Sequence, residues 1–346
     1  MLRKGTLMIK VGIVGATGYA GEELIDILLR HPEVRIDHIS AKIDKPQAIS
    51  EIFPRFNGKI NHICALPNVK AMAKCDVVFL ALPHTVSMKF VPALLKAGKK
   101  VIDLSADYRL QDVRVYEEFY KVTHQDSARL PQAVYGMPEL YRNKIKSAQL
   151  IANPGCYPTV SILAVAPLAA LGLIDTASII IDAKSGVTGA GRKAHIDFCF
   201  PEINEDFKAY RVNTHQHMPE INQEISKLAG KKVNVTFVPH LLPLNRGILA
   251  TIYAKKAPGS KRLAQSALSL YEKFYKNEPF VRIRKAGDFP KLKDVIKTNF
   301  CDIGIKEEKE QFIVVAAIDN LLKGASGQAV QNFNIMYRFA ENTALL

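Results

Sequence analysis

The sequence predicts an α/β protein, with a Rossmann-like doubly wound parallel sheet and a second, α+β domain built on a mixed sheet. The 346 residues exceed the usual size of a single hydrophobic core. Strand-like and helix-like segments alternate through the first half, whereas strand-like segments dominate after about residue 178. We expect residues 1–155 and 320–346 to form the first domain, and residues 156–319 to form the second.

The first half supplies the pattern of a parallel sheet with crossover helices. Residues 8–16 are apolar and β-branched, which predicts a buried strand, and residues 19–32 have apolar side chains at helical spacing until Pro32 ends the helix. Residues 85–98 predict another helix, and Gly98 suits its C-terminal cap. Four further strands are predicted, at residues 34–40, 75–83, 99–106 and 149–154.

The second half has fewer helical segments. It predicts a mixed and largely antiparallel sheet, with strands at residues 177–186, 231–241, 246–256 and 310–320. The last stretch, residues 326–341, returns to helical spacing. We expect this terminal helix to pack back on the first domain.

Composition and charge limit the classes of partner. The chain has 47 lysines and arginines against 33 acidic residues, a net charge of +14, which favours acidic partners. The cations are spread along the chain, and the densest stretch, residues 280–297, has no accompanying nucleic-acid motif. We therefore expect an anionic metabolite and no nucleic acid. The longest apolar run, residues 160–174, is too short for a membrane span and contains Pro167, so no membrane partner is expected.

The five cysteines are scattered, without a CxxC motif or a short pairing pattern. This distribution argues against a structural zinc site and a disulfide scaffold, and it favours a reducing, cytoplasmic setting. We expect no metal site.

A glycine-rich turn lies between the first predicted strand and the first predicted helix. Its glycines recur every third residue, which lets backbone N–H groups approach a phosphate closely at the start of the helix. We predict that this turn binds the phosphates of a dinucleotide through Gly15, Thr17, Gly18, Tyr19, Ala20 and Gly21.

The end of the second predicted strand bears on the choice of cofactor. Ser40 and Lys42 stand where an acidic residue would bind the ribose 2′-hydroxyl of NAD. A hydroxyl and a cation suit a 2′-phosphate, so NADP(H) is the predicted cofactor. Asp37 and Asp44 nearby leave NAD open.

Cys156 follows the fifth predicted strand and opens an apolar helical run. A helix N-terminus lowers the pKa of a thiol, and ligands of parallel sheets bind beyond the carboxyl ends of the strands. A buried structural cysteine is the alternative. A nucleophilic thiol needs a base, and the densest histidine segment supplies His215 and His217, with Glu220 placed to orient His217.

Cations and a further histidine complete the candidate site. His84 directly follows the predicted strand at residues 75–83, where it would face the cofactor. Arg109 follows another strand, and Arg192 closes a second glycine-rich loop, residues 185–192; either guanidinium could hold an anionic substrate. A plain flexible loop remains an alternative for residues 185–192.

Several short sequence motifs, spread in order over nearly the whole chain, resemble those of a known family. They are GATGYAGEEL, FLALPHTVS, VIDLSADYRL, YGMPEL, NPGCYPT, SGVTGAGR, HQHMPEI, PHLLPLNRGIL and NLLKGASGQAVQNFNIM. Together they resemble the N-acetyl-γ-glutamyl-phosphate reductase family. The resemblance implies an NADP-dependent, phosphorylating oxidoreductase of arginine biosynthesis, which reduces N-acetyl-L-glutamyl 5-phosphate to the semialdehyde through a cysteine thioester.

The resemblance also implies roles for particular residues. Cys156 is the expected nucleophile, His217 the acid/base with Glu220 as its orienter, and Arg109 a phosphate ligand. Further expected cofactor contacts are Ser185, Gly186, Asn320 and Gly324, and further expected substrate contacts are Asn153, Arg192 and His215. A homodimer or homotetramer is typical. This chain departs from the family pattern at Gln216, where arginine is common, and around residues 42–49.

Three alternatives stay open at this point. Aspartate-semialdehyde dehydrogenase shares the plan but fits the paired-histidine and YGMPEL blocks poorly. A lysine-pathway reductase that acts on an aminoadipyl phosphate attached to an acidic carrier protein would suit the net charge of +14. A regulatory NADP-binding protein would keep the glycine turn without needing Cys156 and His217 together.

Overall fold

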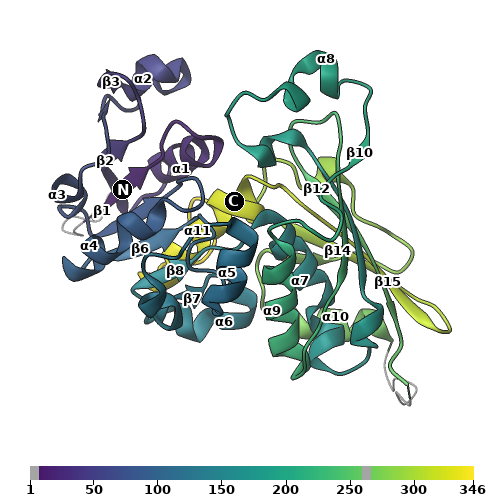
Figure 1. The fold of residues 1–346 in the computed structure, drawn as a ribbon. Coiled ribbons are helices and arrows are strands. Elements are labelled where there is room, and N and C mark those ends of the chain that lie inside the picture. Colours follow the sequence, from purple (N-terminus) through teal and green to yellow (C-terminus); the bar gives the residue numbers. More distant parts are fainter. Residues whose placement is uncertain (1–7, 259–265) are drawn as a thin grey trace. The chain divides into compact units, whose positions relative to one another are not determined.

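The computed structural model describes residues 8–258 and 266–346, and the chain divides into two compact units (Figure 1). One unit comprises the chain up to Pro154 together with Ala325–Leu346, and the other comprises Gly155–Gly324. The boundaries expected from the sequence differ at Gly155 and at residues 320–324, which belong to the second unit. The physical reason is hydrogen bonding: Asn320 Oδ1 accepts from Gly247 N–H at 2.7 Å, and Gly324 N–H donates to the Asp319 carbonyl at 2.9 Å.

The first unit contains a six-stranded parallel sheet with the order β2-β1-β5-β6-β8-β7. The strands are β1 Ile9–Val14, β2 Val34–Ser40, β5 Val77–Leu80, β6 Lys100–Asp103, β7 Val134–Tyr135 and β8 Leu150–Ala152. All five strands predicted from the sequence are confirmed. The sixth, β7, is only two residues long, which is too short for an apolar period to reveal it. The strand order changes direction at β1, and the glycine-rich turn follows this strand.

Helices of the first unit pack on this sheet and on one another: α1 lies against β1, β2 and α11, and α11 also contacts α6. Their bounds are α1 Tyr19–Leu29, α2 Ile49–Ile52, α3 Val69–Met72, α4 Val91–Lys96, α5 Val113–Tyr120, α6 Pro138–Ile145 and α11 Gly327–Met336. Short 3₁₀ turns cover Pro54–Phe56, Ser87–Lys89 and Ser127–Gln132, and β3 Gln47–Ala48 pairs with β4 Ile63–Cys64. The terminal helix predicted to join the first domain is therefore part of the first unit.

The bounds of the helix predicted over residues 85–98 are wrong. The structure forms a 3₁₀ turn over Ser87–Lys89 and begins α4 only at Val91. Pro92 has no N–H and is tolerated in the first helical turn, so it fixes the start of α4. Ala97 is the C-cap, and Gly98 follows it at φ +73°.

The second unit is built on a seven-stranded mixed sheet with the order β10-β11-β9-β12-β15-β14-β13. The strands are β9 Ile180–Ser185, β10 Lys208–Ala209, β11 Thr236–Leu241, β12 Ile248–Lys255, β13 Val281–Ile283, β14 Cys301–Glu307 and β15 Gln311–Ile318. Neighbours β11 and β9 are parallel, as are β13 and β14, and the other pairs are antiparallel. The mixed sheet and its four predicted strands are confirmed.

One face of this sheet is covered by helices, which Figure 1 shows on the same side of β14 and β15. Helix α7 packs against β12, β15 and α9, and α10 contacts β14. The helices are α7 Cys156–Ala170, α8 Phe200–Ile203, α9 Met218–Ala229 and α10 Ala267–Phe274, with 3₁₀ turns at Thr176–Ser178, Val187–Ala190, Ile196–Phe198 and Leu292–Asp294 and one π-helical turn at Leu322–Ser326. Residues 157–169 of α7 are all buried, which explains why the sequence there is apolar on every side.

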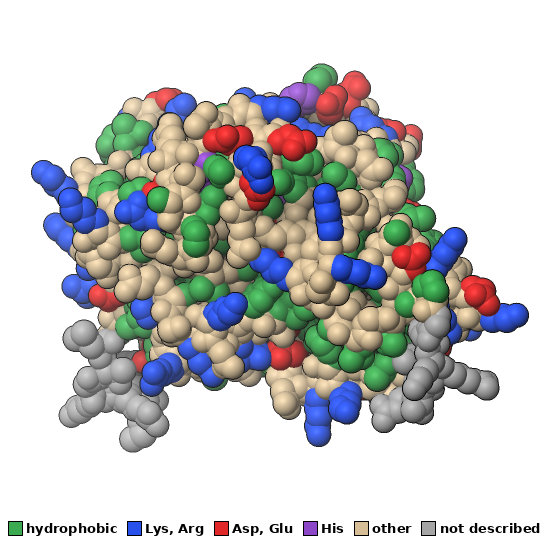
Figure 2. Space-filling view, turned by 60° about the horizontal axis from the view of Figure 1, so that its bottom comes forward, with side chains coloured by type: hydrophobic (Ala, Val, Ile, Leu, Met, Phe, Trp, Pro, Cys, Tyr) green, Lys and Arg blue, Asp and Glu red, His purple; other side chains and the backbone are tan. Residues whose placement is uncertain are grey.

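Two surface properties complete the description. Among residues 8–258 and 266–346, no helix combines the length and the apolar character that crossing a membrane needs. Figure 2 shows lysine and arginine side chains scattered over one face, with apolar and acidic side chains between them. The net positive charge on that face is therefore dispersed.

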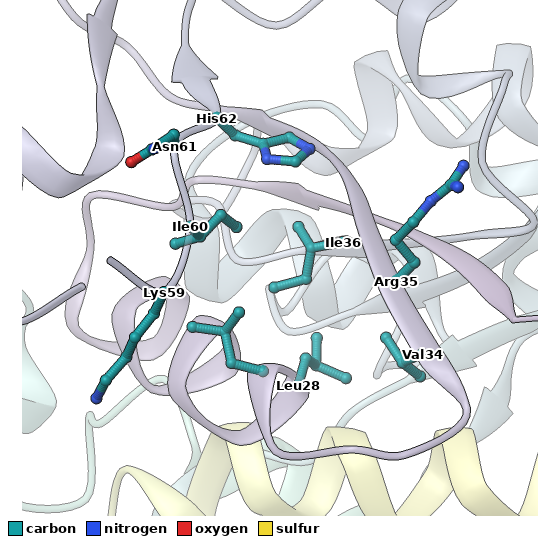
Figure 3. A pocket seen from close by; sticks show the side chains of 9 residues that line it. Leu28, Val34, Arg35, Ile36, Lys59, Ile60, Asn61 and His62 are labelled. Carbon is teal, nitrogen blue, oxygen red and sulfur yellow. The ribbon is translucent and has the colours of Figure 1, made fainter. Parts of the chain in front are cut away.

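A pocket of about 480 Å³ lies in the first unit, between the end of α1, the start of β2 and residues 59–62 (Figure 3). Leu28, Ile36 and Ile60 point into it, whereas Arg35 and Lys59 extend away from its centre. Because it borders the amino end of β2, it lies at the opposite end of that strand from the glycine turn. The sequence predicted nothing at this position.

Candidate active site

The structure places Cys156 at the first position of α7, as the sequence predicts. Gly155 is the N-cap with extended backbone (φ −69°, ψ 158°), and its carbonyl accepts hydrogen bonds from Thr159 N–H and Oγ1, each at 2.9 Å. Gly155 has no side chain to cap the helix, and Pro158 has no N–H. The first-turn N–H groups of a helix have no partner within it and carry its positive end, so α7 directs a positive potential at the thiol.

Glu220 ties α9 to the residue before the thiol. Its side chain is 1% exposed, and Oε1 accepts a hydrogen bond of 2.9 Å from Gly155 N–H. The sequence selected Glu220 for its spacing from His217, but Gly155 is 65 positions away, so no local pattern could reveal this contact. Glu220 thus fixes the loop that presents Cys156.

The paired histidines lie at the start of α9, where His217 is the N-cap. His217 N–H donates to Nδ1 of His215 at 3.0 Å, and the two ring centroids are 4.9 Å apart. The ring of Tyr157, the residue after Cys156, contacts both: its centroid is 5.3 Å from that of His215 and 6.0 Å from that of His217. The second unit therefore brings the predicted nucleophile, base and orienter together at the facing ends of α7 and α9.

Tyr210 lies in the same group of residues, and the sequence did not predict its role. Its hydroxyl lies 3.2 Å from Tyr157 Oη and 3.4 Å from His215 Nε2. Burial raises the pKa of Tyr210 to about 12, and the charge of nearby Cys156 acts in the same direction. Burial likewise raises the pKa of Tyr157. A single tyrosine beside a two-residue strand carries no sequence signal that could have singled it out.

Two glycines allow close packing around the cysteine and the second glycine-rich loop. A Cβ on Gly324 would lie 2.9 Å from Cys156 Cβ, which is shorter than real contacts of this kind. A Cβ on Gly186 would lie 2.7 Å from Arg246 N. Both residues were predicted as cofactor contacts, and the structure gives each a packing reason to be glycine.

Asp319 is a buried carboxylate beside this loop, and the sequence did not predict its role. Its carboxylate is fully buried and forms a two-pronged ion pair with Arg246, at 2.9 Å to Nε and 3.0 Å to Nη2. It also accepts from the N–H groups of Lys297 and Leu321, at 2.7 and 2.8 Å. Asn320, the next residue, donates from Nδ2 to Thr188 Oγ1 at 2.9 Å. Its amide therefore braces the loop from inside the unit.

The remaining predicted residues of this loop differ in exposure. Ser185 is 3% exposed, and its hydroxyl donates to the Gly186 carbonyl at 2.9 Å. Arg192 is exposed and follows Gly191, whose φ is +85°. Of the two, Arg192 is the one that can reach out to a ligand.

In the first unit, the glycine turn forms a cradle. Gly15 has φ +88°, and a Cβ there would lie 2.1 Å from the Ala81 carbonyl oxygen; a Cβ on Gly21 would lie 2.3 Å from the Gly15 oxygen. The turn is held by the Ser40 carbonyl, which accepts from Gly15 N–H at 2.8 Å. Helix α1 then begins at Tyr19 behind Gly18, which has no capping side chain. First-turn N–H groups of Tyr19, Ala20 and Gly21 suit a dinucleotide phosphate, with Thr17 in the loop just before them.

Ser40 and Lys42, the two residues predicted to select the cofactor, differ in exposure. The side chain of Ser40 is fully buried, because the carbonyl end of β2 packs beneath the glycine turn. The cofactor contact of this hydroxyl stays a prediction. Lys42, two residues further on, is exposed.

His84 is held by the segment after β6. Its Nδ1 accepts a hydrogen bond of 3.0 Å from Ala106 N–H. Burial, together with the charge of Arg109, lowers the pKa of His84 to about 4. The ring is therefore neutral near pH 7 and carries its proton on Nε2.

Arg109 and Asn153 hold the carboxyl ends of β6 and β8. Arg109 donates from Nε to the Asn153 carbonyl and from Nη2 to the Leu104 carbonyl, each at 2.7 Å. The Asn153 side chain is fully buried, where it donates to the Ala325 carbonyl and accepts from Asn332, each at 3.1 Å. This burial argues against the direct substrate contact predicted for Asn153. Its amide instead secures the strand that leads to Cys156.

Both halves of the chain match families of known proteins. Residues 10–148 match the profile of the semialdehyde dehydrogenase NAD binding domain, and residues 156–320 match that of the semialdehyde dehydrogenase dimerisation domain. Proteins named N-acetyl-gamma-glutamyl-phosphate reductase are 50% identical in Desulfotalea psychrophila, 49% in Geotalea daltonii and 46% in Symbiobacterium thermophilum, with 98% of each chain covered. The chain belongs to the N-acetyl-γ-glutamyl-phosphate reductase family. The resemblance found in the ordered sequence blocks is thereby confirmed.

Membership in this reductase family makes the chain an oxidoreductase of the semialdehyde dehydrogenase type, with a first unit that binds a nicotinamide cofactor. Solved structures share the fold at low sequence identity. Aspartate semialdehyde dehydrogenase II of Vibrio cholerae aligns with a TM-score of 0.71 and 18% identity over 96% of this chain and 98% of that chain. The Candida albicans enzyme with NADP gives 0.67 and 17% over 97% and 99%. The fold class predicted from the sequence is confirmed.

Proposed function

We propose that this chain reduces N-acetyl-L-glutamyl 5-phosphate with NADPH to N-acetyl-L-glutamate 5-semialdehyde and phosphate, through a thioester on Cys156. The observation that carries this proposal is the position of Cys156 at the open N-terminus of α7, next to the paired histidines at the start of α9. The names of the relatives supply the substrate.

The cysteine performs the first step. The Cys156 thiolate attacks the acyl carbon, the bond between that carbon and the phosphate oxygen breaks, and phosphate leaves. The positive end of α7 favours the thiolate. His217 accepts the thiol proton. First-turn N–H groups of α7 are suited to stabilise the oxyanion that forms during the attack.

The first unit holds the cofactor. The cradle of Gly15, Gly18 and Gly21 suits the pyrophosphate, and the exposed Lys42 suits a 2′-phosphate, which favours NADP(H) over NAD(H). When bound, NADPH supplies the hydride that reduces the thioester carbon. Collapse of the resulting hemithioacetal then breaks the C–S bond, which releases the aldehyde and returns the thiolate to Cys156.

Cations complete the substrate site in this proposal. The guanidinium of Arg109 lies at the carboxyl ends of β6 and β8, where ligands of doubly wound sheets bind, and it supports a phosphate group by charge. Arg192 is exposed at the end of its loop and is suited to the α-carboxylate. His215 lines the same group of residues as His217.

A homodimer through the open face of the mixed sheet fits the match to a dimerisation domain. On the face opposite α7 and α10, Tyr253 of β12 pairs with Ile180 of β9 and Ile313 of β15. Ile180 is 42% exposed and Tyr253 is 36% exposed. Such an apolar stripe on a sheet is suited to bury itself against a second copy. A reducing cytoplasm suits the exposed Cys199 and the reactive Cys156.

The proposed function is tested by running the reaction backwards. N-acetylglutamate semialdehyde, phosphate and NADP should give phosphate-dependent NADPH formation, with NAD giving a rate at least about tenfold lower. The carrier-linked aminoadipate semialdehyde is assayed beside it, because the +14 charge would suit an acidic carrier. Turnover of the carrier-linked substrate alone would contradict the proposed substrate, and equal rates with NAD would contradict the cofactor preference.

A further inference from the structure

A chain of hydrogen bonds connects the neighbour of His217 to the neighbour of Cys156 within the second unit. It starts at His215, whose Nδ1 accepts from His217 N–H at 3.0 Å. A neutral imidazole that accepts at Nδ1 carries its proton on Nε2. The Nε2–H of His215 is therefore a donor, and Tyr210 Oη lies 3.4 Å from it.

The chain continues through two phenols. Tyr210 Oη donates to Tyr157 Oη at 3.2 Å, and Tyr157 Oη donates to the His240 carbonyl at 3.4 Å. A hydroxyl has one proton to donate, and here each phenol accepts from the preceding group and donates to the next. The direction that satisfies every group in the chain runs from His215 through Tyr210 and Tyr157 to a backbone carbonyl that can only accept.

The surroundings favour a neutral, well-ordered chain. His215 is 7% exposed and Tyr157 is 2% exposed. The ring of Phe237 packs edge-on against both, at 5.5 and 5.3 Å between centroids. Burial raises the pKa of Tyr210 to about 12, so its hydroxyl is protonated near pH 7.

Tyr210 is also fixed through its backbone. It follows β10, and its N–H donates to the Pro239 carbonyl at 3.0 Å, beside the His240 carbonyl at which the chain ends. The hydroxyl of Tyr210 is therefore presented from the sheet, whereas Cys156 comes from α7 and His217 from α9. It links these three elements by hydrogen bonds to Tyr157 and His215.

We propose that Tyr210 is a positioning residue: by holding His215 to Tyr157, it fixes where His217 stands relative to the Cys156 thiol. Glu220 supplies a second tie between the two helices through Gly155 N–H. Loss of the Tyr210 hydroxyl should therefore displace the base without unfolding the unit. This proposal rests on the proposed function in one respect, the use of Cys156 and His217 as nucleophile and base.

The test compares Tyr210→Phe with Tyr271→Phe. Tyr271 is a matched control in the same unit, since its buried hydroxyl donates to the Ala164 carbonyl on α7 without meeting the histidines. Both changes are made in a Cys199→Ser background, because Cys199 is exposed and Cys156 is partly buried, whereas the other three cysteines are buried. The measurements are the pH dependence of alkylation of Cys156 by iodoacetamide, located by peptide mass spectrometry, and the kcat and KM of the reverse reaction.

For Tyr210→Phe we expect the midpoint of alkylation to rise by about one pH unit, because a displaced His217 no longer favours the thiolate. The kcat should fall about tenfold or more, with KM for the semialdehyde changed less than about twofold, since misplacement affects the reacting groups and not uniform binding. Tyr271→Phe should keep the wild-type alkylation profile. Tyr157→Phe, which breaks the same chain one link further on, should reproduce the effect of Tyr210→Phe.

An alkylation profile and a kcat of Tyr210→Phe that match those of the wild type would overturn the proposal. Equal shifts in Tyr210→Phe and Tyr271→Phe would also overturn it, because they would indicate a general loss of packing. If the proposed substrate fails in the reverse assay, the alkylation profile still decides the role of Tyr210, since it requires neither substrate nor cofactor.

Discussion

The chemistry of single residues in this chain depends on partners distant in sequence. Cys156 was predicted from its place after a strand, and the structure adds Glu220, which binds the N–H of Gly155. The sequence could supply Cys156, His217 and Glu220, because motif and spacing are local properties. It could not supply Tyr210 or Asp319, since their roles arise only when segments far apart in the chain meet. The burial of Ser40 beneath the glycine turn was unpredictable for the same reason, since it is a tertiary property.

His84 yields a prediction for the pH dependence of stability. Its pKa is lowered by burial from an ordinary 6.5 to about 4 in the folded protein. Between these values the unfolded chain binds more protons, so the free energy of unfolding should fall as the pH drops from about 6.5 to 4. In His84→Gln, urea denaturation across this range should show a smaller fall than in the wild type. Identical slopes in the two proteins would show that His84 is not buried as a neutral ring.

At the level of elements, the outcome of several predictions depended on the positions of glycines and prolines. Strands of the parallel sheet were found because they are apolar and bounded by turns, and the glycine turn was found because its glycines recur every third residue between a strand and a helix. The helix over residues 85–98 was drawn too long, because Pro92 sets the true start of α4. Gly324 was assigned to the cofactor, yet its nearest neighbour is the Cβ of Cys156. The spacing of apolar residues predicts where helices and strands lie along the chain. Close contacts between these elements depend on the packed structure.

Substitution of Gly324 tests this packing. In Gly324→Ala the added methyl group would meet Cys156 Cβ at 2.9 Å, so the first turn of α7 must shift. We expect kcat of the reverse reaction to fall about tenfold or more, as misplacement of a nucleophile predicts, with KM for NADP nearly unchanged. A raised KM for NADP with an unchanged kcat would instead favour the cofactor contact inferred from the sequence.

At the level of the whole molecule, the division of the chain separates two tasks. The first unit carries the glycine cradle, and the second carries Cys156, the paired histidines and the sheet face opposite α7 and α10. Length and the change in pattern near residue 178 were enough to predict two domains. The exact limits were not predictable, because residues 320–324 are held in the second unit by hydrogen bonds to Gly247 and Asp319.

The sheet face opposite α7 and α10 gives a prediction for the proposed homodimer. Ile180→Asp combined with Tyr253→Asp places charges in the apolar stripe, and we expect the dimer to weaken about a hundredfold, as loss of central interface residues does. Analytical ultracentrifugation at micromolar concentration should then show a monomer. Leu171→Asp, at an exposed apolar position in the loop after α7, is the matched control and should remain dimeric. A dimer that survives the double substitution would place the interface elsewhere.

The central claim is that Cys156 carries the acyl group, and acylation without cofactor tests it most directly. The wild-type chain is mixed with N-acetylglutamyl 5-phosphate in the absence of NADPH, and both phosphate release and the mass of the peptide that contains Cys156 are measured. We predict a burst of about one equivalent of phosphate, with the acyl group on Cys156, as a covalent mechanism requires. In Cys156→Ala the burst should vanish. An equal burst in Cys156→Ala, or an acyl group on another residue, would contradict the account.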